Sequence, residues 1–145
     1  LWRLTVGLMQ AAVFAFVGFA VLGLEPRGNL LLFAAAATVG TLTFVSMGYL
    51  LAGLSRTIDG ASALAQVVNF PLMFLSGIFF PAQILPPFLM PVMQLMPPTY
   101  LAAAFRQTMV GYPALNPLWL DFTVLSAWLI AFVGLSLRFF RWHQT

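Results

Sequence analysis

The sequence has no lysine, no cysteine and very little charge. Six arginines and three acidic residues are the only charged residues among 145, so charged residues make up 6% of the chain and hydrophobic residues 62%. A soluble domain has about 25% charged residues, and so few charges cannot cover the surface of a water-soluble globule. The composition therefore excludes a soluble enzyme and a nucleic-acid-binding protein, and it is the opposite of the composition that produces disorder.

The missing residue types also exclude most kinds of catalytic, metal-binding and phosphate-binding site. Without cysteine there are no disulfides and no thiolate metal sites, and without lysine there is no phosphate-binding loop. The carboxylates Glu25, Asp59 and Asp121 are scattered, and the one histidine, His143, is close to the end. We therefore expect no catalytic, cofactor-binding or metal site, and no enzyme activity in this chain. The predicted membrane spans have no charge in their interiors, which disfavours coupling to an ion gradient.

Long uncharged runs dominate the remaining sequence. A transmembrane helix needs about 20 mostly apolar residues, and the chain supplies such runs between short polar turns. The sequence therefore predicts an all-α integral membrane protein with four transmembrane helices. The predicted spans cover about residues 4–24, 30–54, 61–80 and 118–140.

The segment 81–117 follows a different pattern, because prolines break it into short pieces. We expect two short helices, one over 86–96 and one that Thr99 caps and that runs to Val110, with Gly111 just past its end. Helices of about 15–18 Å cannot cross a core of about 30 Å. We expect the segment to lie at the interface or to enter the membrane and return. The residues of interest in this excursion are Pro81, Pro86, Pro97, Thr99, Tyr100 and Arg106.

The arginines predict the orientation. Four spans place both ends of the chain on one side, and that side receives four arginines while the other receives two. Cytoplasmic segments are enriched in basic residues. We therefore expect a multi-pass protein of the plasma or inner membrane, with both ends cytoplasmic and the excursion outside. The cytoplasmic arginines are Arg3, Arg56, Arg138 and Arg141, and the outer ones are Arg27 and Arg106.

The third span has one polar face, because polar residues recur there at helical spacing. Two of them, Gln66 and Asn69, are amides that lipid would leave without hydrogen-bond partners. Two interpretations stay open, in which the amides either join helices together or line a transport pathway. The face consists of Ser62, Gln66, Asn69, Met73 and Ser76.

The second span has a stripe of small residues. Small side chains allow membrane helices to approach closely, so we expect a helix-packing seam that includes Thr41, Gly48 and Ala52. The full stripe is Thr38, Thr41, Val45, Gly48, Ala52 and Ser55.

The order of features from Tyr49 onward resembles a known family. Residues 69–81 read NFPLMFLSGIFFP, and Ile84-Leu85-Pro86, Met96-Pro97-Pro98-Thr99-Tyr100 and Phe105-Arg106 follow. In this order the motifs resemble those of the membrane subunits of ATP-binding-cassette exporters of the second type, the ABC-2 permeases. They resemble the drug-export type more than the polysaccharide type.

The resemblance implies six spans per subunit, so residues 1–145 would be a partial transmembrane domain with the last four. It implies export of drugs, lipids or glycans through a pathway between two permease subunits, as a homodimer or heterodimer. A partner ATPase subunit would bind ATP and magnesium, and membrane lipid would surround the spans. The alternative is a structural or signalling membrane module, which would not predict the proline-broken excursion.

Overall fold

The structure is a computed structural model that describes residues 2–21, 23, 25, 28–55, 57–75, 90–111 and 116–139. All regular secondary structure in these ranges is helical, which confirms the predicted all-α fold class. The elements are α1 (Trp2–Phe16), the π-helix η1 (Val17–Val21), α2 (Leu30–Leu54), α3 (Ile58–Leu75), α4 (Met90–Leu95), α5 (Pro97–Val110) and α6 (Leu118–Phe139).

Three stretches of the described chain are long and apolar enough to cross a membrane, namely Trp2–Val21, Leu30–Leu54 and Leu118–Arg138. The third predicted span, 61–80, falls partly on α3, and its residues from Ser76 onward lie outside the described residues. A crossing by α3 therefore stays a prediction, as does the membrane position of the excursion.

The first two spans differ in how regular they are. The sequence predicts a membrane span over about 4–24, and in the structure the α-helical pattern of this segment ends at Phe16 and continues as a π-helix to Val21. A π turn contains one more residue than an α turn and therefore shifts the face that later residues present. By contrast, α2 has the bounds that the sequence predicts, because the Asn29 side chain accepts a hydrogen bond from the backbone N–H of Leu31 at 2.9 Å and caps its start.

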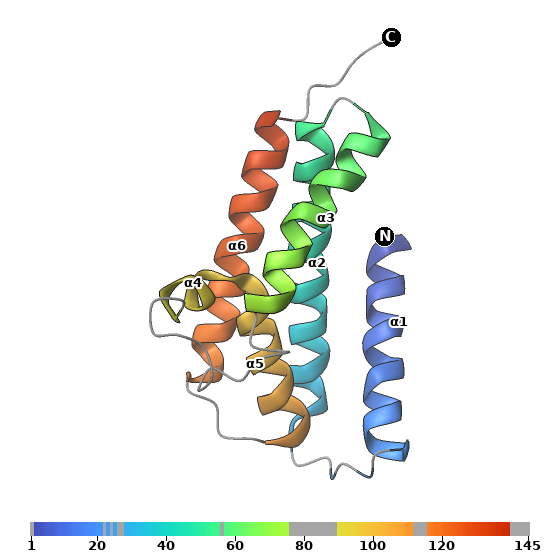
Figure 1. Cartoon of the computed structure of the whole chain (residues 1–145). Coiled ribbons are helices and arrows are strands. Elements are labelled where there is room, and N and C mark those ends of the chain that lie inside the picture. Colours follow the sequence, from blue (N-terminus) through green and yellow to red (C-terminus); the bar gives the residue numbers. More distant parts are fainter. Residues whose placement is uncertain are drawn as a thin grey trace.

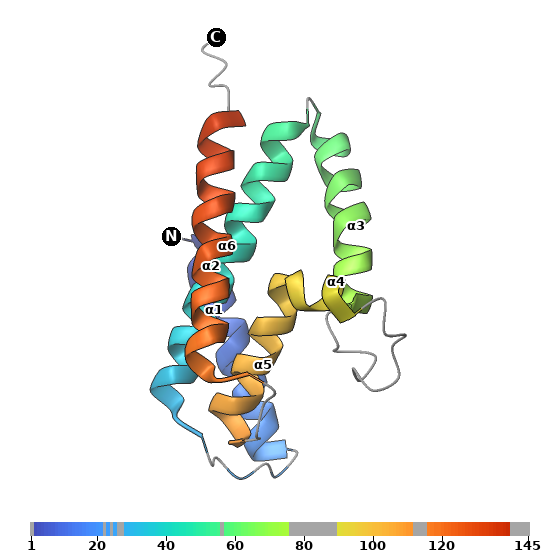
Figure 2. The same cartoon turned by 90° about the vertical axis from the view of Figure 1, so that its left-hand side faces the viewer.

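Helix α2 is the centre of the fold, with α1, α3, α5 and α6 packed around it. Figures 1 and 2 show the end of α2, the start of α3 and the end of α6 at one end of the molecule. The start of α2, the end of α5 and the start of α6 lie at the other end (Figure 1). Successive helix ends in the described chain therefore meet at opposite ends of the molecule.

The tightest packing is between α2 and α6. Thr43 on α2 and Leu125 on α6 are both completely buried. The Thr43 hydroxyl lies 2.8 Å from the Val39 carbonyl oxygen on its own helix and 3.3 Å from the Leu125 carbonyl oxygen on α6. Short side chains bring these helices close enough for such a contact, which is how membrane helices associate without a hydrophobic driving force.

Helix α5 begins earlier than the sequence predicts. It begins at Pro97 instead of being capped by Thr99, because proline has no N–H to leave unpaired and its fixed φ suits the first helical position. The Thr99 hydroxyl instead donates a hydrogen bond to the Met93 carbonyl oxygen at 2.8 Å, which folds α4 against α5. The end of α5 agrees with the prediction, since Gly111 follows it with φ 65°.

Helix α5 packs lengthwise against the N-terminal half of α2. Near the end of α5, the carbonyl oxygen of Thr108 lies so close to Gly28 that a side chain at position 28 would not fit. Further along, the Phe33 and Phe105 rings lie 5.0 Å apart, and Gly40 faces Leu101. Helix α5 is thus packed into the helix bundle, with Tyr100, Ala104 and Thr108 buried, whereas no residue of α4 is buried.

Candidate functional site

The polar face predicted for the third span is exposed on α3. Ser62, Gln66, Asn69 and Met73 all have exposed side chains, and Ser76 lies outside the described residues. Two of the four also line a cavity of about 300 Å³ between α2, α3 and α5, which we call the α3–α5 cavity. It is lined by Phe44, Asn69, Leu72, Met73, Pro98, Leu101, Ala102 and Phe105.

The α3–α5 cavity is apolar except for one amide. Asn69 offers both a hydrogen-bond donor and an acceptor, while the other lining side chains supply aromatic, aliphatic and thioether surface. Among the residues that the structure describes, no titratable side chain lines this cavity. The arrangement suits an apolar or amphipathic molecule that one polar contact orients.

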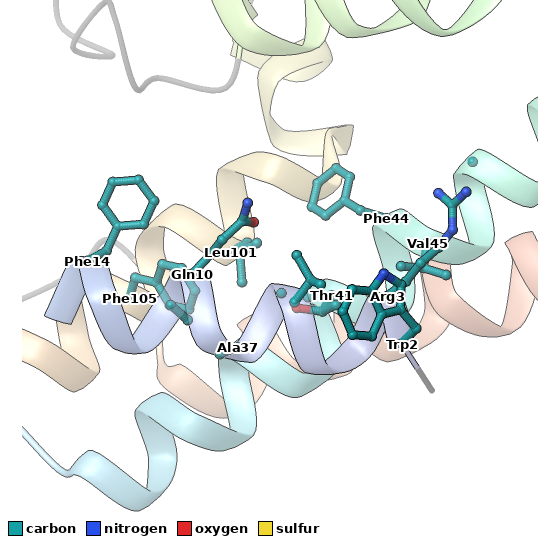
Figure 3. A pocket seen from close by; sticks show the side chains of 15 residues that line it. Trp2, Arg3, Gln10, Phe14, Ala37, Thr41, Phe44, Val45, Leu101 and Phe105 are labelled. Atoms are coloured by element: carbon teal, nitrogen blue, oxygen red, sulfur yellow. The ribbon is translucent and has the colours of Figure 1, made fainter. Parts of the chain in front are cut away.

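A larger cavity of about 630 Å³ lies on the other side of α5, between α1, α2 and α5. We call it the α1–α2 cavity, and Figure 3 shows side chains from all three helices facing it. Its polar side chains are Arg3, Gln10 and Thr41. Phe44, Leu101 and Phe105 line both cavities, so these side chains form a shared wall between them.

The residues of the predicted small-residue seam differ in their surroundings, because one is in close contact with a neighbouring helix and two face open space. Thr41 packs closely on α1, where a Cβ added to Gly7 would lie 2.5 Å from the Thr41 methyl group. Gly48 lines the α1–α2 cavity and has open space where a Cβ would be, and Ala52 is exposed. The seam at Gly48 and Ala52 therefore stays a prediction that concerns contacts outside the described residues.

Close packing instead uses a neighbouring stripe on α2, which the sequence interpretation missed. An added Cβ at Gly40 would lie 2.5 Å from a methyl group of Leu101, and Thr43 bonds to α6. The same spacing rule applied to a second set of small residues would have found it. The buried α2 residues are Phe33, Ala36, Ala37, Gly40, Thr43, Ser46 and Leu50.

A buried carboxylate joins α5 to α6. Asp121, in the first turn of α6, has no exposed surface. Its Oδ2 accepts a hydrogen bond from Gln107 Nε2 at 2.7 Å, and the same nitrogen donates to the Asn116 carbonyl oxygen at 3.2 Å. Asp121 Oδ1 has no hydrogen-bond partner among the described residues. We call the Gln107–Asp121 pair the α5–α6 clasp.

The clasp distinguishes two neighbouring residues of the excursion, Arg106 and Gln107. Of the two, it is Gln107 that donates to Asp121, and the Arg106 side chain is exposed. A helix turns about 100° per residue, so a neighbour in sequence points elsewhere. Of the other residues of interest, Tyr100 donates to the Gln94 carbonyl oxygen and Pro97 is buried, while Pro81 and Pro86 lie outside the described residues.

Comparison with known families decides the class of protein. Residues 1–110, which include every helix up to the end of α5, match the family described as ABC-2 type transporter. The chain belongs to this family. It is therefore a membrane subunit of the ABC transporter class, as the motif order from Tyr49 onward suggested.

Two relatives show how much of such a protein this chain represents. It is 34% identical over 101 residues to the Inner membrane transport permease YadH of Escherichia coli K12, which covers 69% of this chain and 39% of the relative. It is 25% identical over 131 residues to ABC transporter G family member 20 of Dictyostelium discoideum, covering 89% of this chain and 18% of that protein. No solved structure matches the chain. The ABC-2 chain described here thus spans well under half the length of either relative.

Proposed function

We propose that this chain forms part of the pathway of an ABC exporter and that a molecule crosses the membrane beside α3 and α5. The proposal rests on the family and on the α3–α5 cavity, in which Asn69 is the polar group. A partner ATPase subunit that binds ATP and magnesium would drive transport, and a second permease subunit would complete the pathway. The three apolar helices support residence in a membrane.

The cavity also bears on the substrate class. A space of about 300 Å³ is at the lower end of the usual range for small-molecule sites. Its aromatic and aliphatic walls stabilise apolar surface, and a single amide discriminates by hydrogen bonding and not by charge. These properties favour an uncharged or amphipathic small molecule of the drug or lipid type over a polysaccharide, whose many hydroxyls would lack partners here.

The proposal is tested with the full-length protein reconstituted with its ATPase. Asn69→Leu should change substrate-stimulated ATPase activity severalfold while basal activity and assembly persist. Gln66→Leu is the matched control, because it removes an exposed amide of the same face that does not line the cavity. If both variants alter assembly equally, the amides join helices. If neither variant changes transport, the pathway does not run along this face.

The proposed orientation places both ends of the chain in the cytoplasm, and it can be tested by cysteine labelling. The chain has no native cysteine, so single added cysteines have no background within it. Tyr112→Cys, just after α5, should react with an impermeant reagent in intact cells, whereas Asp59→Cys, at the start of α3, should not. The reverse labelling pattern would invert the topology.

A further inference from the structure

The α1–α2 cavity is long and narrow. Trp2 and Arg3 line one end and Phe14 the other, as Figure 3 shows. The stretch from Arg3 to Phe14 extends about 16 Å along α1. The cavity remains open along this length partly because Gly48 leaves space that a side chain would fill.

The lining of the cavity is asymmetric in charge. Among the described residues that line it, Arg3 is the one charged residue and none is a carboxylate. The Arg3 guanidinium lies 5.9 Å from the centre of the Tyr49 ring, a cation–π distance that holds the charge beside α2. Away from Arg3 the walls are mostly apolar, and they include Val6, Ala11 and Phe14. An occupant should therefore be anionic at one end and apolar along the rest.

The charged end of the cavity also lies where a membrane has its headgroups. Trp2 and Arg3 begin a stretch that is long and apolar enough to span a membrane, and tryptophan and arginine are typical of such boundaries. Two residues that line the cavity are themselves largely exposed, with Trp2 79% and Phe14 74% exposed. In a membrane this surface faces lipid, so the cavity can be reached from the bilayer.

We propose that the α1–α2 cavity holds a resident anionic phospholipid. Its phosphate pairs with Arg3, and one acyl chain lies along Gly7, Ala11 and Phe14 as far as the shared wall. An apolar helix of the longer protein is a poorer match, because it would bring no anionic group to Arg3.

The test uses the full-length transporter, purified in detergent and supplied with dioleoyl phosphatidylglycerol or dioleoyl phosphatidylcholine. Native mass spectrometry counts the lipids that remain bound, and thermal unfolding gives the stabilisation by each lipid. We expect a preference of about fivefold for the anionic lipid, the effect of one basic residue near an anionic surface. Glycerophosphoglycerol, which has the same headgroup without acyl chains, should give no stabilisation.

Variants assign the lipid to this cavity. Arg3→Gln should abolish the preference, and Arg3→Lys should largely restore it because the positive charge returns. Gly48→Leu should remove one bound lipid of either kind. Gly134→Leu is the matched control, since Gly134 on α6 also has open space but does not line the cavity.

Three outcomes would overturn the proposal. The first is a preference that survives in Arg3→Gln, and the second is a lipid count that is the same in Gly48→Leu and Gly134→Leu. The third is stabilisation by glycerophosphoglycerol equal to that by the lipid, which would indicate a site for a soluble phosphate ester. If Gly48→Leu does not fold while Gly134→Leu does, a protein segment fills the space, and the lipid assignment is wrong.

Discussion

On the side of α2 that faces α5 and α6, small and hydroxyl side chains are buried, and the Thr43 hydroxyl reaches a backbone carbonyl oxygen of α6. On the side that faces α1, a cavity of about 630 Å³ lies beside the close approach of Gly7 to Thr41. Both sides have similar small residues, so composition does not cause the difference. Packing is tight where the excursion folds back into the bundle and loose where α1 lies alone.

Glycine substitutions provide the sharpest test of this contrast. Gly40→Leu should destabilise the full-length protein by about 1–3 kcal/mol, because the new side chain would overlap Leu101 in a packed interface. In detergent without added phospholipid, Gly48→Leu should change the melting temperature far less, since open space surrounds it. Thermal unfolding of the purified variants measures both. Equal losses of stability would show that the two sides of α2 are packed alike.

The α5–α6 clasp should give the next largest effect. A double-mutant cycle with Gln107→Ala and Asp121→Ala should show a coupling of about 1 kcal/mol, because each residue supplies the other's hydrogen bond within the bundle. The corresponding cycle with Arg106→Ala and Asp121→Ala should be additive. Chemical or thermal unfolding gives the four stabilities for each cycle. Coupling in the second cycle alone would reassign the partner of Asp121 to Arg106.

The smallest expected effect concerns one hydroxyl. Thr43→Val keeps the shape of the side chain but removes its donation to the Leu125 carbonyl oxygen on α6, which should cost about 0.6 kcal/mol. Thr38→Val is the control, because its hydroxyl bonds within α2 to the Ala34 carbonyl oxygen. If the two variants unfold at the same temperature, the contact with α6 adds nothing to stability.

The sequence predicted the positions of the long helices well, for a simple reason. Transmembrane length, flanking polar turns and a capping Asn29 are local signals, and α2 and α6 begin where these signals occur. It did not predict which face of α2 is buried. A helix that is apolar on all sides has little amphipathic asymmetry to indicate its buried face, so the spacing of small residues indicated one stripe while the buried stripe lies one to two positions away from it.

The site could be predicted only in part. The polar face of α3 could be predicted from the spacing of its residues. Which of them line the cavity, Asn69 but not Gln66, depends on where α5 packs, and that is a long-range contact. The pairing of Gln107 with Asp121 had the same difficulty, because it depends on how α5 packs against α6. The start of α5 at Pro97 was a local feature that could have been predicted from the preference of proline for the first helical position.

The wall that both cavities share has a thermodynamic consequence. Phe44, Leu101 and Phe105 cannot move toward one cavity without enlarging the other. If a molecule in the α1–α2 cavity changes the affinity of the α3–α5 cavity for a second molecule by some factor, the second must change the affinity for the first by the same factor. The composition of the surrounding bilayer would then act as an effector of transport, and transport substrates would in turn alter which lipids stay bound.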